Sequence, residues 1–111
     1  MKTGIIISCT DAETVWNAFR LGSFAIERGD GVKVFLLGRG VECANTNSEA
    51  FDVPDFDVHG QMENFAGAGG EILACGTCLQ IRQSKGSEIC PISTMADLYN
   101  IVDQSDRLLT F

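Results

Sequence analysis

The chain has 111 residues, of which 45% are hydrophobic and 21% charged, the balance of an ordinary globular protein. Its formal net charge is -7, and its Lys and Arg residues form no patch, which argues against direct nucleic-acid binding. No apolar run approaches transmembrane length, and the first residues do not resemble a signal peptide. We therefore expect one domain over residues 1–111, located in the cytoplasm, with no membrane partner.

The first third of the chain predicts a strand, a helix and a second strand. Gly4–Ser8 is a short isoleucine-rich run, typical of a strand buried on both faces. Thr10–Glu13 reads as a capping box, and apolar residues follow it at helical spacing over Ala12–Ile26. Gly29 ends this helix, and Val32–Leu37 is the second buried strand.

The middle of the chain predicts a long loop followed by three elements. Gly38–Asp57 is rich in acidic residues, and we expect a loop there with a short helix around Glu42–Asn45. His59–Ala66 predicts a modest helix, Glu71–Cys75 a third strand, and Gly76–Gln83 a short helix. A loop of this length in a small domain usually carries function or covers an interface.

The last part of the chain predicts two more strands around one helix. Glu88–Cys90 suggests a brief fourth strand, stopped by Pro91. Thr94–Asp97 is a second capping-box pattern, and Arg107–Phe111 reads as the final strand. The helix between them is expected to present an apolar stripe made of Met95, Leu98, Tyr99 and Val102.

The alternation of strands and helices predicts an α/β fold. Right-handed crossovers would give a mostly parallel sheet of about five strands with helices on both faces. The expected architecture is a three-layer α/β/α sandwich, flavodoxin-like in general form. Sites in such sheets lie beyond the carboxyl ends of the strands, where Ser8, Gly38 and Cys75 are expected.

Cys75 is the strongest candidate for chemistry. It ends a predicted strand and directly precedes a predicted helix, whose free N–H groups and partial positive charge would lower the pKa of its thiol. The resulting thiolate attacks disulfides, persulfides and electrophilic carbon. The alternative is a buried cysteine that only fills space, and position alone leaves the two readings open.

Cys78 completes a Cys-x-x-Cys pattern with Cys75, which resembles a dithiol redox site and makes Cys78 a candidate resolving thiol. As half of a zinc site the pattern lacks a second pair, and His59 is the only histidine. We interpret His59 as a surface or helix-starting residue and expect no metal. The glycine-rich stretches have neither the pattern nor the position of phosphate loops, so no cofactor is predicted.

The other three cysteines are less informative. The total of five is odd, and in the absence of a secretory signal it predicts reduced thiols rather than a disulfide framework. Cys9 follows the first strand and Cys43 lies in the long loop, so either is a candidate to receive or resolve a sulfur adduct. Cys90, beside Pro91, is interpreted as structural.

The pattern as a whole resembles the DsrE/DsrF-like family, which includes TusD-like sulfur-relay proteins. The resemblance covers nearly the whole chain. It is carried by Val34-Phe35-Leu36 and Gly40-Val41, by Ile72–Cys75 followed by Arg82, and by the ending Ser105–Phe111. It implies a three-layer α/β/α fold and assembly into homo-oligomers (dimers, trimers or hexamers) or hetero-oligomers with related subunits.

In the sulfur-relay branch, the resemblance further implies that the matching cysteine, Cys75, accepts sulfane sulfur as a persulfide and passes it to a partner protein. A persulfide is a reversible cap on a thiolate. Cys78 is an additional cysteine relative to TusD and could attack that persulfide. Three hypotheses follow: a sulfur carrier with donor and acceptor proteins, a non-catalytic oligomeric module that binds a ligand or partner beside the long loop, and a dithiol redox protein.

Overall fold

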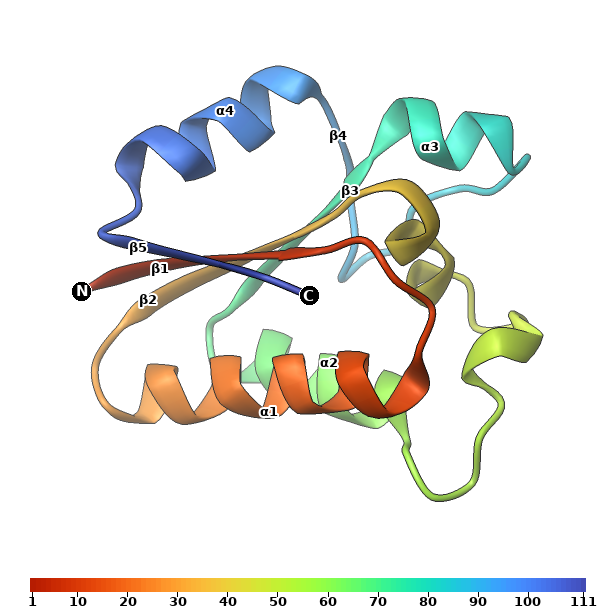
Figure 1. The fold of residues 1–111 in the computed structure, drawn as a ribbon, viewed down its shortest axis with the longest axis horizontal. Coiled ribbons are helices and arrows are strands. Elements are labelled where there is room, and N and C mark those ends of the chain that lie inside the picture. The colour runs from red at the N-terminus through yellow and green to blue at the C-terminus, as the bar shows by residue number, and fades with distance from the viewer.

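The computed structural model describes residues 1–111 and contains one five-stranded sheet (Figure 1). All neighbouring strands are parallel, and the spatial order is β4-β3-β2-β1-β5. The strands are β1 (Lys2–Ile7), β2 (Gly31–Leu36), β3 (Glu71–Cys75), β4 (Ile92–Ser93) and β5 (Arg107–Thr110). The predicted α/β fold with a parallel, five-stranded sheet is confirmed.

Helices cover both faces of this sheet. Figure 1 shows α1 (Ala12–Glu27) and α2 (Val58–Gly67) on one face, and α3 (Gly76–Ile81) and α4 (Met95–Gln104) on the other. The predicted long loop after β2 contains two short 3-10 helices, η1 (Gly38–Ala44) and η2 (Glu49–Phe51). None of the helices is both long enough and apolar enough to cross a membrane.

The main core lies between the sheet and the α1–α2 layer. Phe19 of α1 and Phe65 of α2 are fully buried and meet edge to face, with ring centroids 5.6 Å apart. Gly22 makes this possible, because a Cβ there would lie 2.8 Å from the Phe65 ring. Edge-to-face aromatic pairs contribute beyond their buried area, so this contact fixes the two helices against each other.

The start of α1 differs from the sequence prediction by one residue. Thr10 was expected to cap the helix, with Glu13 completing the capping box, but the N-cap is Asp11. The Asp11 carboxylate accepts hydrogen bonds from the Thr14 N–H (3.0 Å) and the Thr14 hydroxyl (2.6 Å). A carboxylate that accepts two bonds is the stronger cap, so the helix begins at Ala12. The second predicted capping box, Thr94 with Asp97, is confirmed.

The sequence predicts the fourth strand before Pro91, but in the structure the strand follows this residue. Residues 88–90 were expected to be extended, but Ser87 and Cys90 instead bond each other's backbone groups in a tight turn. Strand β4 is Ile92–Ser93, which pairs with Ala74 and Cys75 of β3. Because proline lacks an N–H but keeps its carbonyl, Pro91 can precede a strand and still accept a bond from the Ala74 N–H (3.0 Å).

Three of the four residues of the predicted apolar stripe of α4 do not face the core. Met95, Tyr99 and Val102 are 63%, 66% and 46% exposed. The fourth, Leu98, is partly buried against the core, and Ile101 is the buried residue of the helix. Ile101 lies over Gly4 of β1, where a Cβ would be 2.8 Å from the Ile101 side chain. The helix therefore contacts the sheet through a narrow strip and leaves most of its apolar residues uncovered.

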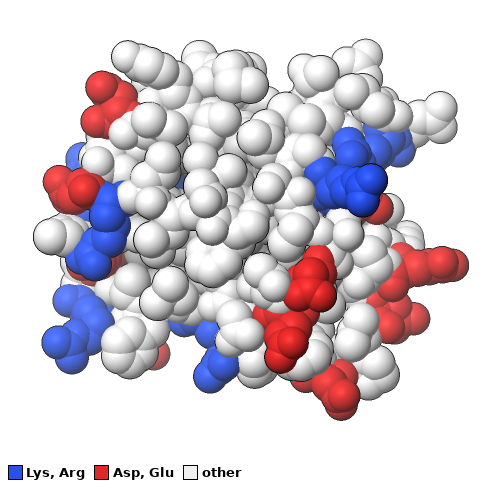
Figure 2. Space-filling view, in the orientation of Figure 1, with Lys and Arg blue, Asp and Glu red and all other residues white.

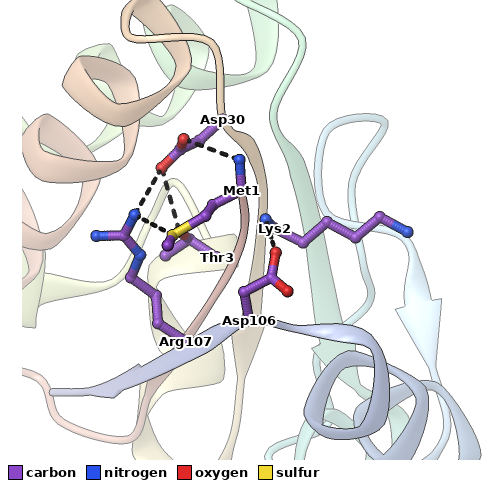
Figure 3. A network of polar contacts seen from close by, with 6 residues as sticks. All are labelled: Met1, Lys2, Thr3, Asp30, Asp106 and Arg107. Atoms are coloured by element: carbon purple, nitrogen blue, oxygen red, sulfur yellow. Dashed lines mark hydrogen bonds and ion pairs between the residues drawn. The ribbon is translucent and has the colours of Figure 1, made fainter.

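A polar network joins the N-terminus of the chain to the start of β5 at the amino edge of the sheet (Figure 3). The Asp30 carboxylate pairs with the amino group of Met1 (3.3 Å) and with Arg107 (3.6 Å). The Asp106 carboxylate accepts a bond from the Lys2 N–H, and the Asp106 N–H donates to the Lys2 carbonyl, both at 2.7 Å. These contacts set the register of β5 against β1 and leave the carboxyl edge free for a site.

Candidate functional site

The carboxyl edge of the sheet brings together residues from three strands. Leu37, just beyond β2, donates its N–H to the Ile7 carbonyl at the end of β1 (2.9 Å). Ser8 is occupied elsewhere, since its N–H and hydroxyl both donate to the carbonyl of Phe111. Gly38 and Cys75 remain on the β2–β3 side of this edge, and the candidate site lies between them.

Cys75 and Cys78 face each other at this edge. Cys75 is the last residue of β3 and the N-cap of α3, and only 6% of it is exposed. Cys78 lies one helical turn later and is half-buried. The Gly38 N–H donates to the Cys78 sulfur at 3.3 Å, and the Cys75 side chain lies close enough to Cys78 to raise the pKa of the Cys78 thiol. Both sulfurs therefore belong to one polar cluster.

The thiol of Cys78 is held in its protonated form. Burial, followed by the hydrogen bond to Cys75, raises its pKa above the ordinary value of 9.0. The Gly38 N–H and the nearby positive charge of Arg82 act in the opposite direction and lower the pKa, but they do not outweigh burial. At neutral pH Cys78 thus presents an S–H group that can donate a hydrogen bond to the Cys75 sulfur.

Arg82 ties the site to the segment after β2. One of its guanidinium nitrogens, Nη1, donates to the Cys78 carbonyl (3.2 Å), and Nε lies 3.7 Å from the Glu42 carboxylate in η1. Helix α3 has only six residues, fewer than two turns, so its macrodipole is a minor contribution. The contacts of Arg82 are made to Cys78 and Glu42.

The remaining cysteines lie apart from this pair. Cys43 and Cys90 are fully buried, and Cys43 donates its thiol hydrogen bond to the Gly40 carbonyl (3.0 Å). Burial, followed by the charge of neighbouring Cys90, raises the pKa of Cys43 well above 9.0, and burial raises the pKa of Cys90 to about 11. Buried thiols with raised pKa values are poor nucleophiles near neutral pH, which favours a structural role for both residues. Cys9, near Cys43, is half-buried.

His59 has no catalytic partner. It is the second residue of α2, as a helix-starting histidine would be, and it is half-buried. Its Nε2 lies 3.1 Å from the carbonyl oxygen of Cys43, not from the Cys43 thiol, and its ring meets Phe51 edge to face. Through these contacts the His59 side chain connects the segment after β2 to α2.

Two open grooves flank these elements. One, of 740 Å³, runs between α3 and the start of α4 and is lined by Gly76 and Thr77, the residues between the two cysteines, and by Ser93 and Met95. The other, of 630 Å³, lies in the loop between Thr46 and His59 and is mainly polar. The first groove borders the residues between Cys75 and Cys78, although neither cysteine lines it.

Sequence reasoning found the two cysteines but missed two of their supports. The Gly38 N–H comes from a different strand end, 40 residues away from Cys78, and a backbone group leaves no signal in a sequence. The Glu42–Arg82 ion pair also joins distant segments. The family resemblance singles out Arg82 because it follows Cys75, but no sequence pattern indicates its partner Glu42.

Comparison with known proteins confirms the resemblance drawn from the sequence. A model of the DsrE/DsrF-like family matches residues 1–111. An uncharacterised protein from Methanocaldococcus jannaschii is 30% identical over 118 residues, covering 100% of both chains. An uncharacterised protein from Methanopyrus kandleri is 30% identical over 102 residues, covering 89% of this chain and 83% of its own.

Solved structures show the same fold at lower sequence identity. The ychN protein from E. coli superposes with a TM-score of 0.83 at 18% identity, covering 100% of both chains. A conserved protein of unknown function from Bacteroides thetaiotaomicron superposes with a TM-score of 0.74 at 18% identity, covering 99% of this chain and 94% of its own. At this identity the likeness establishes the arrangement of strands and helices.

Proposed function

The chain belongs to the DsrE/DsrF-like family, and we propose on this premise that it is a sulfur carrier that holds sulfane sulfur as a persulfide on Cys75. The observation that carries the proposal is the place of Cys75. It ends β3 at the carboxyl edge of the sheet and lies one helical turn before Cys78, whose carbonyl accepts a hydrogen bond from the Arg82 guanidinium. The thiolate is the form of a cysteine that accepts sulfur.

The loading step needs only the Cys75 thiolate and a donor persulfide. The Cys75 sulfur attacks the outer sulfur of the donor, a new S–S bond forms, and the donor leaves as a thiolate with the electron pair of the broken bond. Unloading is the same exchange with an acceptor thiol as nucleophile. Because Cys75 is nearly buried, the adduct is shielded from solvent, and a partner would approach along the groove lined by Gly76 and Thr77.

Persulfide loading of Cys75 is the direct test. We expect the protein to gain about 32 Da, the mass of one sulfur atom, after brief incubation with inorganic polysulfide, and Cys75→Ser to gain none. Intact-mass spectrometry followed by peptide mapping measures both. Cys9→Ser is the matched control, because Cys9 is half-buried but stands outside the pair, and it should load like the parent. An equal adduct on Cys75→Ser would refute the proposal.

We also propose that the chain acts as a homo-oligomer. The apolar residues Met95, Tyr99 and Val102 of α4 are exposed in the single chain, and an interface with a second copy would bury them. In Figure 2 the top and centre of this view are mostly uncharged, with charged side chains at the left, near the end of α4 and the start of β5. Acidic side chains gather at the lower right, near the long loop and the start of α1. Oligomers would present several Cys75 sites to donor and acceptor proteins.

Charge placed on α4 should break this assembly. We expect the double variant Tyr99→Glu/Val102→Glu to shift the molecular mass measured by light scattering to that of a single 12.0 kDa chain. The control is Asn100→Glu, an exposed residue on the same helix that is not apolar, which should keep the parent's mass. If the parent itself runs as a monomer at every concentration, the proposed oligomer is wrong.

The dithiol redox function is the second candidate, and one observation favours it. Cys75 and Cys78 lie one turn apart on the same side of α3, so an internal disulfide needs little movement. A redox protein would cycle between dithiol and disulfide with a defined potential, without carrying sulfur. The mass measurement separates the two functions, since a disulfide lowers the mass by about 2 Da while a persulfide raises it by about 32 Da.

A further inference from the structure

We propose that Cys78 discharges the Cys75 persulfide: its sulfur displaces the outer sulfur as hydrogen sulfide and leaves a Cys75–Cys78 disulfide. This activity rests on the proposed function, because it needs the persulfide as its substrate. It adds an outcome that a carrier with a single cysteine does not have. A loaded chain then either passes its sulfur to a partner or releases it as sulfide.

Geometry places Cys78 against the inner sulfur of such an adduct. Cys75 is the N-cap of α3 and Cys78 is the third residue of this helix, so one turn separates their backbones and their side chains lie on the same side of the helix. The outer sulfur would extend beyond Cys75, so the atom next to Cys78 is the Cys75 sulfur. Attack there breaks the bond to the outer sulfur, whereas attack on the outer sulfur would only move the persulfide to Cys78.

Two groups beside Cys78 stabilise the negative charge that its sulfur acquires when it attacks. The Gly38 N–H already donates to this sulfur at 3.3 Å, and Arg82, held 3.2 Å from the Cys78 carbonyl, contributes positive charge. Both groups stabilise a thiolate more than a thiol. They are fixed by the backbone after β2 and by the ion pair with Glu42, so they need not reorganise during the reaction.

The reaction balances without an added oxidant or reductant. The bond between the Cys75 sulfur and the outer sulfur breaks, and its electron pair leaves with the outer sulfur. The bond between the Cys75 and Cys78 sulfurs forms, and the proton from Cys78 goes to the departing sulfide. The outer sulfur is reduced, the Cys78 sulfur is oxidised, and one H₂S is released per loaded chain. A reducing thiol then resets the disulfide.

Two products measured together test the proposal. The chain is loaded with inorganic polysulfide, desalted at once, and followed by intact mass and by sulfide released into solution. For the parent we expect the adduct to disappear, the mass to fall about 2 Da below that of the reduced chain, and sulfide to appear in equal amount. For Cys78→Ser we expect the adduct to last at least about tenfold longer, with no sulfide.

The Cys78 variants distinguish a failure of the discharge reaction from a failure of the proposed carrier function. If Cys78→Ser gains the adduct and the parent keeps its own equally long, the discharge is wrong and the carrier stands. If neither Cys78→Ser nor Cys78→Ala, each shown to be folded by circular dichroism, gains the adduct, the carrier function itself is wrong. Cys9→Ser is expected to release sulfide like the parent, and a stable adduct on this variant would assign the discharge to Cys9.

Discussion

Gly40→Ala is expected to lower the free energy of unfolding by about 3 kcal/mol, at the upper end for an overpacked position. A Cβ on Gly40 would overlap the carbonyl oxygen of Ile7 and lie 2.7 Å from its carbonyl carbon. The obstructing atoms are backbone, so no side chain can rotate away. The Ile7 carbonyl also accepts the Leu37 N–H at 2.9 Å, which holds it in place. Urea denaturation followed by circular dichroism measures the loss.

The matched control is Gly67→Ala. Gly67 is the last residue of α2, and a Cβ there would meet no atom within 4 Å. Alanine favours the helix over glycine by up to about 1 kcal/mol, so stability should stay the same or rise slightly. A Gly40→Ala variant as stable as the parent would show that η1 can move away from β1 without cost.

This glycine also matters for the site. It lies in η1, between Gly38, which donates to the Cys78 sulfur, and Glu42, which pairs with Arg82. A close approach of η1 to the end of β1 therefore holds both supports of the cysteine pair. Only a residue without a side chain permits that approach, and this requirement comes from a contact across two strands. A sequence pattern does not reveal it.

Elements whose signal is local were predicted well. The apolar runs of β1 and β2 are flanked by glycine and polar residues, and they form buried strands because both of their faces are covered. Thr94 and Asp97 make the capping box expected of them, since both bonds lie within one turn. In each case a few consecutive residues determine the conformation.

Predictions that depend on distant partners were less accurate. The strand beside Pro91 is set by which residues reach β3, and a two-residue strand carries no periodic signal. The apolar residues of α4 follow helical spacing, but spacing does not tell whether the covering surface belongs to the same chain. Cys75 and Cys78 were paired by their spacing alone, whereas the Gly38 N–H reaches them through the fold.

Alkaline pH is expected to destabilise the protein through its buried thiols, and Cys90 gives the clearest case. Burial raises the pKa of Cys90 from 9.0 to about 11 in the folded chain. Between these values the unfolded chain loses the thiol proton while the folded chain keeps it. The ionisation of Cys90 therefore leaves the free energy of unfolding unchanged below pH 9. As the pH rises towards 11, it lowers the free energy of unfolding by about 2–3 kcal/mol.

Cys90→Ala removes this contribution and serves as the comparison. The variant should be less stable than the parent at pH 7, because it leaves a small cavity, but the gap should narrow or reverse by pH 11. Urea denaturation at several pH values between 7 and 11 measures both curves, and the Lys and Tyr groups that titrate in the same range are common to the two proteins. Parallel curves would mean that Cys90 ionises as easily in the folded chain as in the unfolded one. Cys43, whose pKa burial also raises well above 9.0, adds to the alkaline loss in both proteins, so the difference between the curves belongs to Cys90.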